Sequence, residues 1–119
     1  MKYVLLVYGD ENAAANMPAE AMQAFMGEYA AYTTKIQTNG IRKTGEAFQP
    51  TTTATTVRMQ EAKKVTTHGP FAETKEQLGG FYLIECENLD EAIEWAAKCP
   101  DARFGSIEVR PVMEYNQGP

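Results

Sequence analysis

The sequence predicts an α+β fold in which two helices cover one face of a β-sheet. Runs rich in apolar and β-branched residues, typical of strands, recur at residues 3–8, 51–59, 63–67 and 80–86. Two stretches with apolar residues three and four apart, typical of helices, lie between them at 18–38 and after them at 88–98. The 119 residues are 44% hydrophobic and 23% charged, as in ordinary globular proteins, so we expect a single domain over residues 1–119.

The sequence of roughly the first third of the chain predicts a strand, a connection and a helix. Tyr3 to Tyr8 is a nearly continuous apolar run, as in strands that are buried on both faces. Residues 9–17 are small and polar and are expected to form an irregular connection. Pro18 suits the first turn of a helix, where a backbone N–H is not needed. The helix is expected over about 18–38. Its apolar face holds Met22, Phe25, Met26, Tyr29, Thr33 and Ile36.

The sequence of the middle of the chain predicts a series of strands. Residues 41–48 have weak strand character, which Pro50 interrupts. The β-branched stretch 51–59 is predicted to be a strand, and 63–67 is predicted to pair back on it after a short turn. A further strand is expected at 80–86, because this run is dense in apolar residues.

A second helix and a last strand complete the chain. Asn88 is expected to cap the helix, with Glu91 in the reciprocal position of a capping box. Residues 106–113 alternate apolar and charged side chains, and Pro111 favours a position at an edge or a strand end. The expected buried face of the helix consists of Leu89, Ala92, Ile93 and Ala96, with Trp95 and Cys99 at its margin.

This order of elements predicts a ferredoxin-like, split β-α-β sheet. Removing the hairpin formed by 51–59 and 63–67 leaves the order β-α-β-β-α-β, which defines that topology. Both helices then cover the same sheet face, yet the strands at 3–8 and 80–86 carry apolar residues on both faces. Because an exposed apolar sheet face is a liability, we expect a homodimer that packs sheet against sheet.

Charge and composition exclude several functions. The net charge is −5 and the basic residues are scattered, which argues against a nucleic-acid partner and against an anionic membrane. The apolar run near the N-terminus is too short for a signal peptide or a membrane span. Cys86 and Cys99 do not suggest a disulfide framework, so a cytoplasmic location is expected. One histidine and two separated cysteines predict no metal site, and no phosphate-binding or dinucleotide motif predicts a cofactor.

The stretch 65–85 contains the only histidine, His68, at the end of a predicted strand. Gly69 permits a positive φ and Pro70 fixes the next backbone angle, so the chain is expected to reverse there. One interpretation of His68 is an exposed turn residue. The other is a general acid/base at the mouth of a pocket, because an imidazole titrates near neutral pH.

The charged loop that follows has two interpretations as well. Glu73 and Lys75 belong either to a solvated charge cluster or to the wall of a polar cleft, with Lys75 binding an anionic group. Phe71 either ties the loop to the core or stacks on a ligand. Gly79-Gly80 is predicted to mark a bulge or a close backbone approach.

Side chains outside this stretch are also candidates. Tyr8 and Asp10 are either ordinary residues at the end of a strand or part of the same cleft. Tyr29 and Tyr32 either belong to the core or supply hydroxyl groups to a pocket between helix and sheet. The candidate catalytic residue is therefore His68. The candidate ligand-binding residues are Tyr8, Asp10, Tyr29, Phe71, Glu73 and Lys75.

Several runs resemble the YCII-related proteins, in the branch with an Asp-Gly-Pro-Phe motif: "HGPFAETKEQLGGFYLIE", "LDEAIEWAAKCP", "EVRPVMEY", "MKYVLLVYGDE" and "TATTVR". The resemblance covers essentially the whole chain. It implies a ferredoxin-like α+β dimer, an α/β-barrel-like assembly similar to muconolactone-isomerase-type proteins, with mostly unassigned function. Some relatives are associated with extracytoplasmic-function sigma factors. One relative is a dehydrochlorinase, in a branch where a His–Asp pair is proposed as catalytic.

The motif departs from the family at its first position, where His68 replaces Asp. The predicted helix at 18–38 contains no histidine either, so the His–Asp pair cannot be transferred to this chain. Two functions remain open. One is a cofactor-independent lyase or isomerase that uses acid/base chemistry on a small molecule, with His68 as proton carrier and Lys75 as electrostatic partner. The other is a non-catalytic ligand-binding or regulatory module associated with transcription control.

Overall fold

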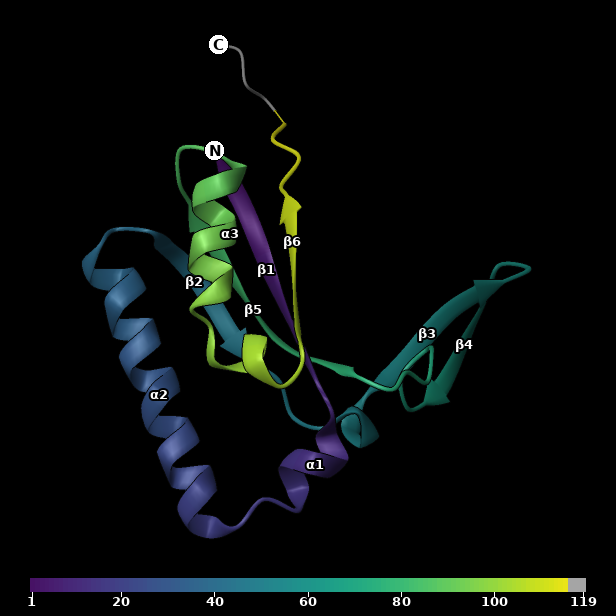
Figure 1. Ribbon diagram of the computed structural model, residues 1–119. Coiled ribbons are helices and arrows are strands. Elements are labelled where there is room, and N and C mark those ends of the chain that lie inside the picture. The colour runs from purple at the N-terminus through teal and green to yellow at the C-terminus, as the bar shows by residue number, and fades with distance from the viewer. Residues whose placement is uncertain (116–119) are drawn as a thin grey trace.

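The computed structural model describes residues 1–115, and its elements follow the predicted order with short helices added (Figure 1). The strands are β1 (Lys2–Gly9), β2 (Arg42–Ala47), β3 (Thr55–Gln60), β4 (Lys63–His68), β5 (Gln77–Glu85) and β6 (Ser106–Pro111). The helices are α1 (Glu11–Ala15), α2 (Ala19–Thr38) and α3 (Leu89–Ala97), with single 3-10 turns η1 (Thr51–Thr53) and η2 (Pro100–Arg103).

The main sheet has four strands in the order β2-β5-β1-β6, and every neighbouring pair is antiparallel. The predicted α+β, ferredoxin-like fold is therefore confirmed. β6 lies at an edge of the sheet, where Pro111 costs no ladder hydrogen bond on its outer side. Figure 1 shows α2 and α3 on the same side of this sheet.

The core lies between this sheet and the two helices. Every second residue of β1 is buried, namely Tyr3, Leu5 and Val7, and they pack with Ile84 of β5. Ile36 of α2 covers them and is 0% exposed. The Tyr32 hydroxyl, also buried, donates a 2.8 Å hydrogen bond to the carbonyl of Trp95, which joins α2 to α3. The C-terminal half of α2 is thus fixed to the core.

The connection predicted at residues 9–17 contains a helix instead. The Asp10 carboxylate accepts hydrogen bonds from the amides of Asn12 and Ala13, which caps α1. This side-chain cap satisfies amides that a helix start leaves unpaired, so a short alanine-rich helix forms without an apolar face. The predicted strand at 51–59 is also partly wrong. Residues 51–53 form a 3-10 turn after Pro50, and the strand begins at Thr55.

The predicted buried face of α3 needs a correction. Leu89 and Ile93 are 46% and 47% exposed, whereas Trp95 and Cys99 are buried in the core cluster. Ala92, Ala96 and Cys99 are spaced three or four residues apart and bring the helix close to the sheet, and Trp95 fills the space beside them. Met26 of α2, also predicted on an apolar face, is 64% exposed. None of the helices within residues 1–115 combines the length and the apolar character that a membrane crossing requires.

β3 and β4 form a separate two-stranded hairpin that projects from the body, and residues 55–68 are called the arm below (Figure 1). Apart from the half-buried Thr56, the residues of both strands are exposed. The arm turns at Glu61 and Ala62, which both have positive φ. Gly69 follows the arm, and its φ of 104° confirms the predicted chain reversal.

Candidate functional site

A cavity of about 600 Å³ lies between the N-terminal half of α2 and the sheet. Residues of α1, α2, β1, β2, β5 and η2 line it. The walls are mainly apolar, and a few polar groups converge on them, as in typical small-molecule sites. The apolar side chains include Val7, Met17, Met22, Phe25 and Phe104.

Glycines of the sheet contribute to this cavity. Gly79 is skipped in the pairing of β1 with β5, because Val7 pairs with Gly80 and Tyr8 pairs with Leu78. An added Cβ on Gly80 would lie 2.7 Å from the carbonyl oxygen of Glu46, so the backbones approach too closely for any other residue. The predicted bulge or close approach at Gly79-Gly80 is confirmed on both counts. These positions place no side chains in the cavity, which leaves it open.

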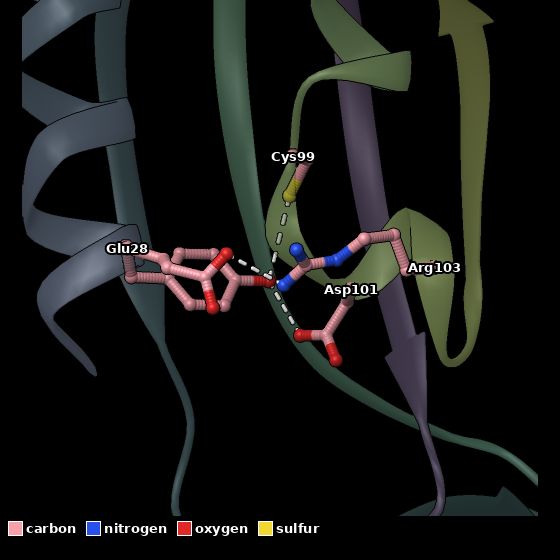
Figure 2. Close-up of polar contacts among 5 residues, drawn as sticks. Glu28, Cys99, Asp101 and Arg103 are labelled. Carbon is pink, nitrogen blue, oxygen red and sulfur yellow. Dashed lines mark hydrogen bonds and ion pairs between the residues drawn. The ribbon is translucent and has the colours of Figure 1, made fainter. Parts of the chain in front are cut away.

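Tyr29, Asp101 and Cys99 meet at one wall of the cavity. The Tyr29 hydroxyl donates a short hydrogen bond to Oδ2 of Asp101, and Sγ of Cys99 lies 3.4 Å from the Tyr29 oxygen. Figure 2 shows Cys99 and Asp101 on the same segment after α3. Since the Tyr29 proton points to the carboxylate, the thiol is the donor in the second contact. A proton-donating chain therefore runs from Cys99 through Tyr29 to Asp101.

Burial keeps this chain protonated. Burial first, and then the hydrogen bond to Asp101, raises the pKa of the Tyr29 phenol far above its ordinary value. Burial also raises the pKa of the Cys99 thiol. Tyr29 is therefore a hydrogen-bond donor and not a base. The carboxylate of Asp101 is the group in this wall that can accept a proton from a ligand.

The same wall is held in place by contacts between α2 and the segment around η2. Arg103 forms a 2.6 Å ion pair with Glu28 on α2, and both side chains are about half-exposed (Figure 2). The rings of Phe25 and Phe104 meet edge to face, with centroids 5.8 Å apart. With the Tyr29–Asp101 hydrogen bond, these contacts hold the N-terminal half of α2 over the cavity.

The end of the cavity next to α1 is polar but internally bonded. Both carboxylate oxygens of Glu11 accept 2.8 Å hydrogen bonds from Thr51, one from its amide and one from its hydroxyl. The Glu11 amide donates to the side-chain oxygen of Gln77. Asp10 lines this end, and its Oδ1 caps α1. These groups join α1, η1 and β5 around the cavity.

The structure separates the residues that the sequence proposes for a site. Tyr29 and Asp10 line the cavity, whereas Tyr8 is half-buried beside it and does not contribute to the lining. His68 and Glu73 line a second hollow of about 420 Å³, which shares Gln77 with the cavity. Phe71 is 79% exposed, and Lys75 is exposed too. Neither belongs to the lining of the two hollows.

Two lining residues are missed by the sequence interpretation, Asp101 and Arg42. Asp101 lies 72 positions from Tyr29, so no local pattern links them. Its position after Pro100, in the turn that follows a helix, is the only local signal. Arg42 begins a strand of weak character, and its charge has no neighbouring partner in the sequence. Among residues 1–115, no three His, Cys, Asp or Glu side chains gather as metal ligands.

Comparison with known proteins supports the topology described above. The YCII-related domain model matches residues 1–116. The chain belongs to this family. A protein of Rhizobium meliloti (strain 1021) that is described as uncharacterised is 39% identical over 120 residues, covering 99% of this chain and 97% of its own.

A solved structure is similar in fold. It is 5-chloro-2-hydroxyhydroquinone dehydrochlorinase from Burkholderia phenoliruptrix AC1100, in complex with 2,5-dihydroxybenzoquinone. The TM-score is 0.56, with 14% identity and full coverage of both chains. At this identity the similarity concerns the fold alone, and function has to be argued from the residues of the cavity.

Proposed function

We propose that this YCII-related protein binds a small molecule in the cavity under α2 and moves a proton on it. The observation that carries the proposal is the Tyr29–Asp101 pair in the wall of a largely apolar cavity of about 600 Å³. Such a cavity excludes water around a bound ligand, which strengthens the interactions of the few polar groups it contains.

Asp101 and Tyr29 have different roles in the proposed acid/base reaction. Asp101 removes a proton from one atom of the ligand. Once Asp101 is protonated, the phenol of Tyr29 is released from its hydrogen bond to the carboxylate and donates to the negative charge that develops on the ligand. If Asp101 returns the proton to another ligand atom, the product is an isomer. If a leaving group departs with its electron pair instead, the reaction is an elimination. Both are cofactor-independent lyase or isomerase reactions.

Hydrogen exchange can test this proposal before a substrate is known. The protein is incubated in D₂O with a panel of small cyclic ketones and acids, and proton NMR detects compounds that lose a C–H signal. We expect Asp101→Asn to lower the exchange rate on such a compound by roughly 10²- to 10⁴-fold. Asp90→Asn, at an exposed position in the first turn of α3, is the matched control. An Asp101→Asn variant with the wild-type rate would contradict the proposal.

We also propose that the protein is a homodimer. The sheet face away from the helices carries Val4, Leu6, Phe81 and Leu83, and no helix of residues 1–115 covers it. The accessible surface is 8580 Å², against roughly 6,400 Å² for a globular monomer of this mass. The arm supports the proposal as well, because an isolated two-stranded hairpin is marginally stable in water. Its formal charge is +2, whereas the other residues carry −7.

Light scattering tests the dimer. At micromolar concentration we expect twice the chain mass of 13.2 kDa. Leu6→Asp, on the uncovered face, should give a monomer. Leu89→Asp, which places the same charge at an exposed position on α3, should leave the dimer intact. A wild-type mass of 13.2 kDa would rule this assembly out.

A cytoplasmic location is proposed on the state of the cysteines. Cys86 and Cys99 are both buried with free thiols. Free cysteines without a disulfide framework are typical of reducing compartments. Fractionation of the native host with an antibody would test this, and recovery from an oxidising compartment would contradict it.

A second candidate function is a non-catalytic ligand-binding or regulatory module associated with transcription control, and the loop after the arm favours it. Phe71 is 79% exposed at the start of a charged loop, which suits a protein partner better than an enclosed ligand. Pull-downs from the native host with wild-type protein and Phe71→Ala should then differ in one partner. Equal recoveries together with exchange of a small molecule in D₂O would favour the enzyme.

A further inference from the structure

Arg42 lies on the cavity side of the sheet and lines the same cavity as Tyr29 and Asp101. In the pairing of β2 with β5, Arg42 pairs with the buried Ile84, and Gly45 pairs with Tyr82. Residues that pair directly share a sheet face, so Arg42 faces the helices. Arg42 and Gly45 both line the cavity.

The guanidinium of Arg42 has few partners. Its Nη2 donates a 3.1 Å hydrogen bond to the carbonyl of Gly45, and its buried Nε has no hydrogen-bond partner. Within residues 1–115 no carboxylate lies within ion-pair distance of it, although Lys43, Arg103 and Arg110 all form such pairs. A half-buried cation without a counterion is costly, and an anionic ligand would compensate for it.

Two hydroxyl groups accompany this charge. The hydroxyls of Thr33 and Tyr82 are 2.9 Å apart, and both residues line the cavity. Burial raises the pKa of the Tyr82 phenol, while the hydrogen bond with Thr33 and the charge of Arg42 act in the opposite direction. Tyr82 therefore remains a neutral donor close to Arg42. A cation and two hydroxyls form one polar end of the cavity.

The polar end at Arg42 and the wall formed by Tyr29 and Asp101 are separated by about one helical turn. Thr33 follows Tyr29 by four residues on α2, a rise of about 6 Å. Aromatic rings line the space on the Tyr29 side, because the rings of Phe25 and Tyr29 pack edge to face with centroids 5.3 Å apart. This arrangement suits a short, flat molecule with a charge at one end.

The other carboxylates of the lining are engaged or turned away. Glu11 is bonded to Thr51, and Asp10 caps α1. Glu46 pairs with Phe81, which places its side chain on the sheet face opposite to Arg42. Repulsion of an anion at the Arg42 end is therefore limited.

We propose that the ligand of this cavity is a small ring-containing organic acid, whose anionic group binds Arg42 while the ring lies toward Asp101. This inference rests on the proposed function and names its ligand class. Arg42 acts as the specificity-determining residue, because a neutral analogue would leave its charge without a partner.

Methionine-methyl NMR can test the inference with benzoate and its neutral counterpart benzamide as probes. Met17 and Met22 line the cavity, whereas Met26, Met59 and Met113 are exposed elsewhere and serve as internal references. We expect benzoate to shift the signals of Met17 and Met22 and to bind roughly tenfold to a hundredfold more tightly than benzamide. This comparison uses wild-type protein only, so it does not depend on the folding of a variant.

Variants test whether the charge that binds benzoate is the guanidinium of Arg42. Arg42→Gln should reduce benzoate affinity by the same factor and leave benzamide affinity unchanged. Lys43→Gln, which removes the same charge one residue away where Lys43 pairs with Glu85, should change neither affinity. Arg42→Lys should retain part of the preference, because lysine keeps the charge but loses the planar fork.

The alternative outcomes separate the two proposals. Equal affinities for benzoate and benzamide at the cavity methionines would overturn the organic-acid inference and leave the binding cavity standing. Shifts confined to Met26, Met59 or Met113, or no shift at millimolar concentration, would overturn both.

Discussion

The two halves of α2 share one apolar periodicity but have different surroundings. In the C-terminal half, Tyr32 and Ile36 are buried in the core. In the N-terminal part, up to the middle of the helix, Met22, Phe25 and Tyr29 are only half-buried and line the cavity. The helix is continuous, so the difference in burial arises from the sheet residues that face it.

The sheet explains this difference. Below the C-terminal half it presents Tyr3 and Ile84, whose side chains fill the space. Below the N-terminal half, Gly45, Gly79 and Gly80 present none. An apolar helix face thus indicates burial against a neighbour, but the opposing residues decide whether that neighbour is protein or ligand. Glycines opposite an apolar helix face are therefore a signal for a binding site.

Truncation of one side chain in each half should give the largest contrast. Ile36→Ala removes a fully buried side chain, and we expect a loss of about 2–5 kcal/mol in the free energy of unfolding. Met22→Ala enlarges a space that is already open, so a loss below about 1 kcal/mol is expected. Urea titration followed by circular dichroism measures both. Similar losses would mean that the two halves are equally packed, contrary to the comparison.

How much of this contrast the sequence predicts depends on whether the signal is local. The periodicity of α2, the Asn88 cap and the Gly79-Gly80 bulge are local features, and the structure confirms each of them. The Asn88 cap departs in one detail, because Glu91 bonds the amide of Glu87 and not that of Asn88. α1 is missed because a capped alanine run has no apolar period.

The candidate site is less accessible from the sequence. Tyr29 is proposed for a pocket between helix and sheet on its spacing alone, and the structure places it in the cavity lining. Asp101 and Arg42 reach the same cavity only through the tertiary fold, from a turn and from a sheet strand. His68 is prominent in the sequence because it is the only histidine, yet it lies at the second hollow. The helical spacing of Tyr29 is therefore a better guide to this cavity than the fact that His68 is the only histidine.

Alkaline titration tests whether the cavity end of α2 excludes water as the core end does. Burial raises the folded-state pKa of Tyr29 at the cavity, of Tyr32 in the core, and of Cys99, which contacts Tyr29. Each group therefore contributes stability below its unfolded pKa, which is lost as pH rises. We expect the free energy of unfolding to decline above about pH 8.5 and more steeply above about pH 10, by at most about 1.4 kcal/mol per pH unit per group. The half-exposed Tyr29 should contribute less than this limit.

Denaturant titrations between neutral and alkaline pH measure this decline. Tyr29→Phe and Tyr32→Phe should each make the part above about pH 10 shallower, because each removes one phenol that ionises only in the unfolded chain. A constant stability up to pH 10.5 would show that neither phenol is shielded. A change in slope for Tyr32→Phe alone would show that water reaches the Tyr29 end freely.

The smallest effect is expected for the same two substitutions at neutral pH. The Tyr32 hydroxyl bonds the Trp95 carbonyl in the buried core, which also accepts a 3.2 Å hydrogen bond from the Lys98 amide. Tyr32→Phe removes one of these two bonds and should cost about 1–1.5 kcal/mol. Tyr29→Phe leaves the carboxylate of Asp101 at a cavity wall, where water can replace the lost donor, and should cost less than about 1 kcal/mol. Urea midpoints of the two variants measure the difference. A larger loss for Tyr29→Phe would mean that its bond to Asp101 anchors α2 more firmly than the core contact does, and the cavity half would then be the better-fixed end of the helix.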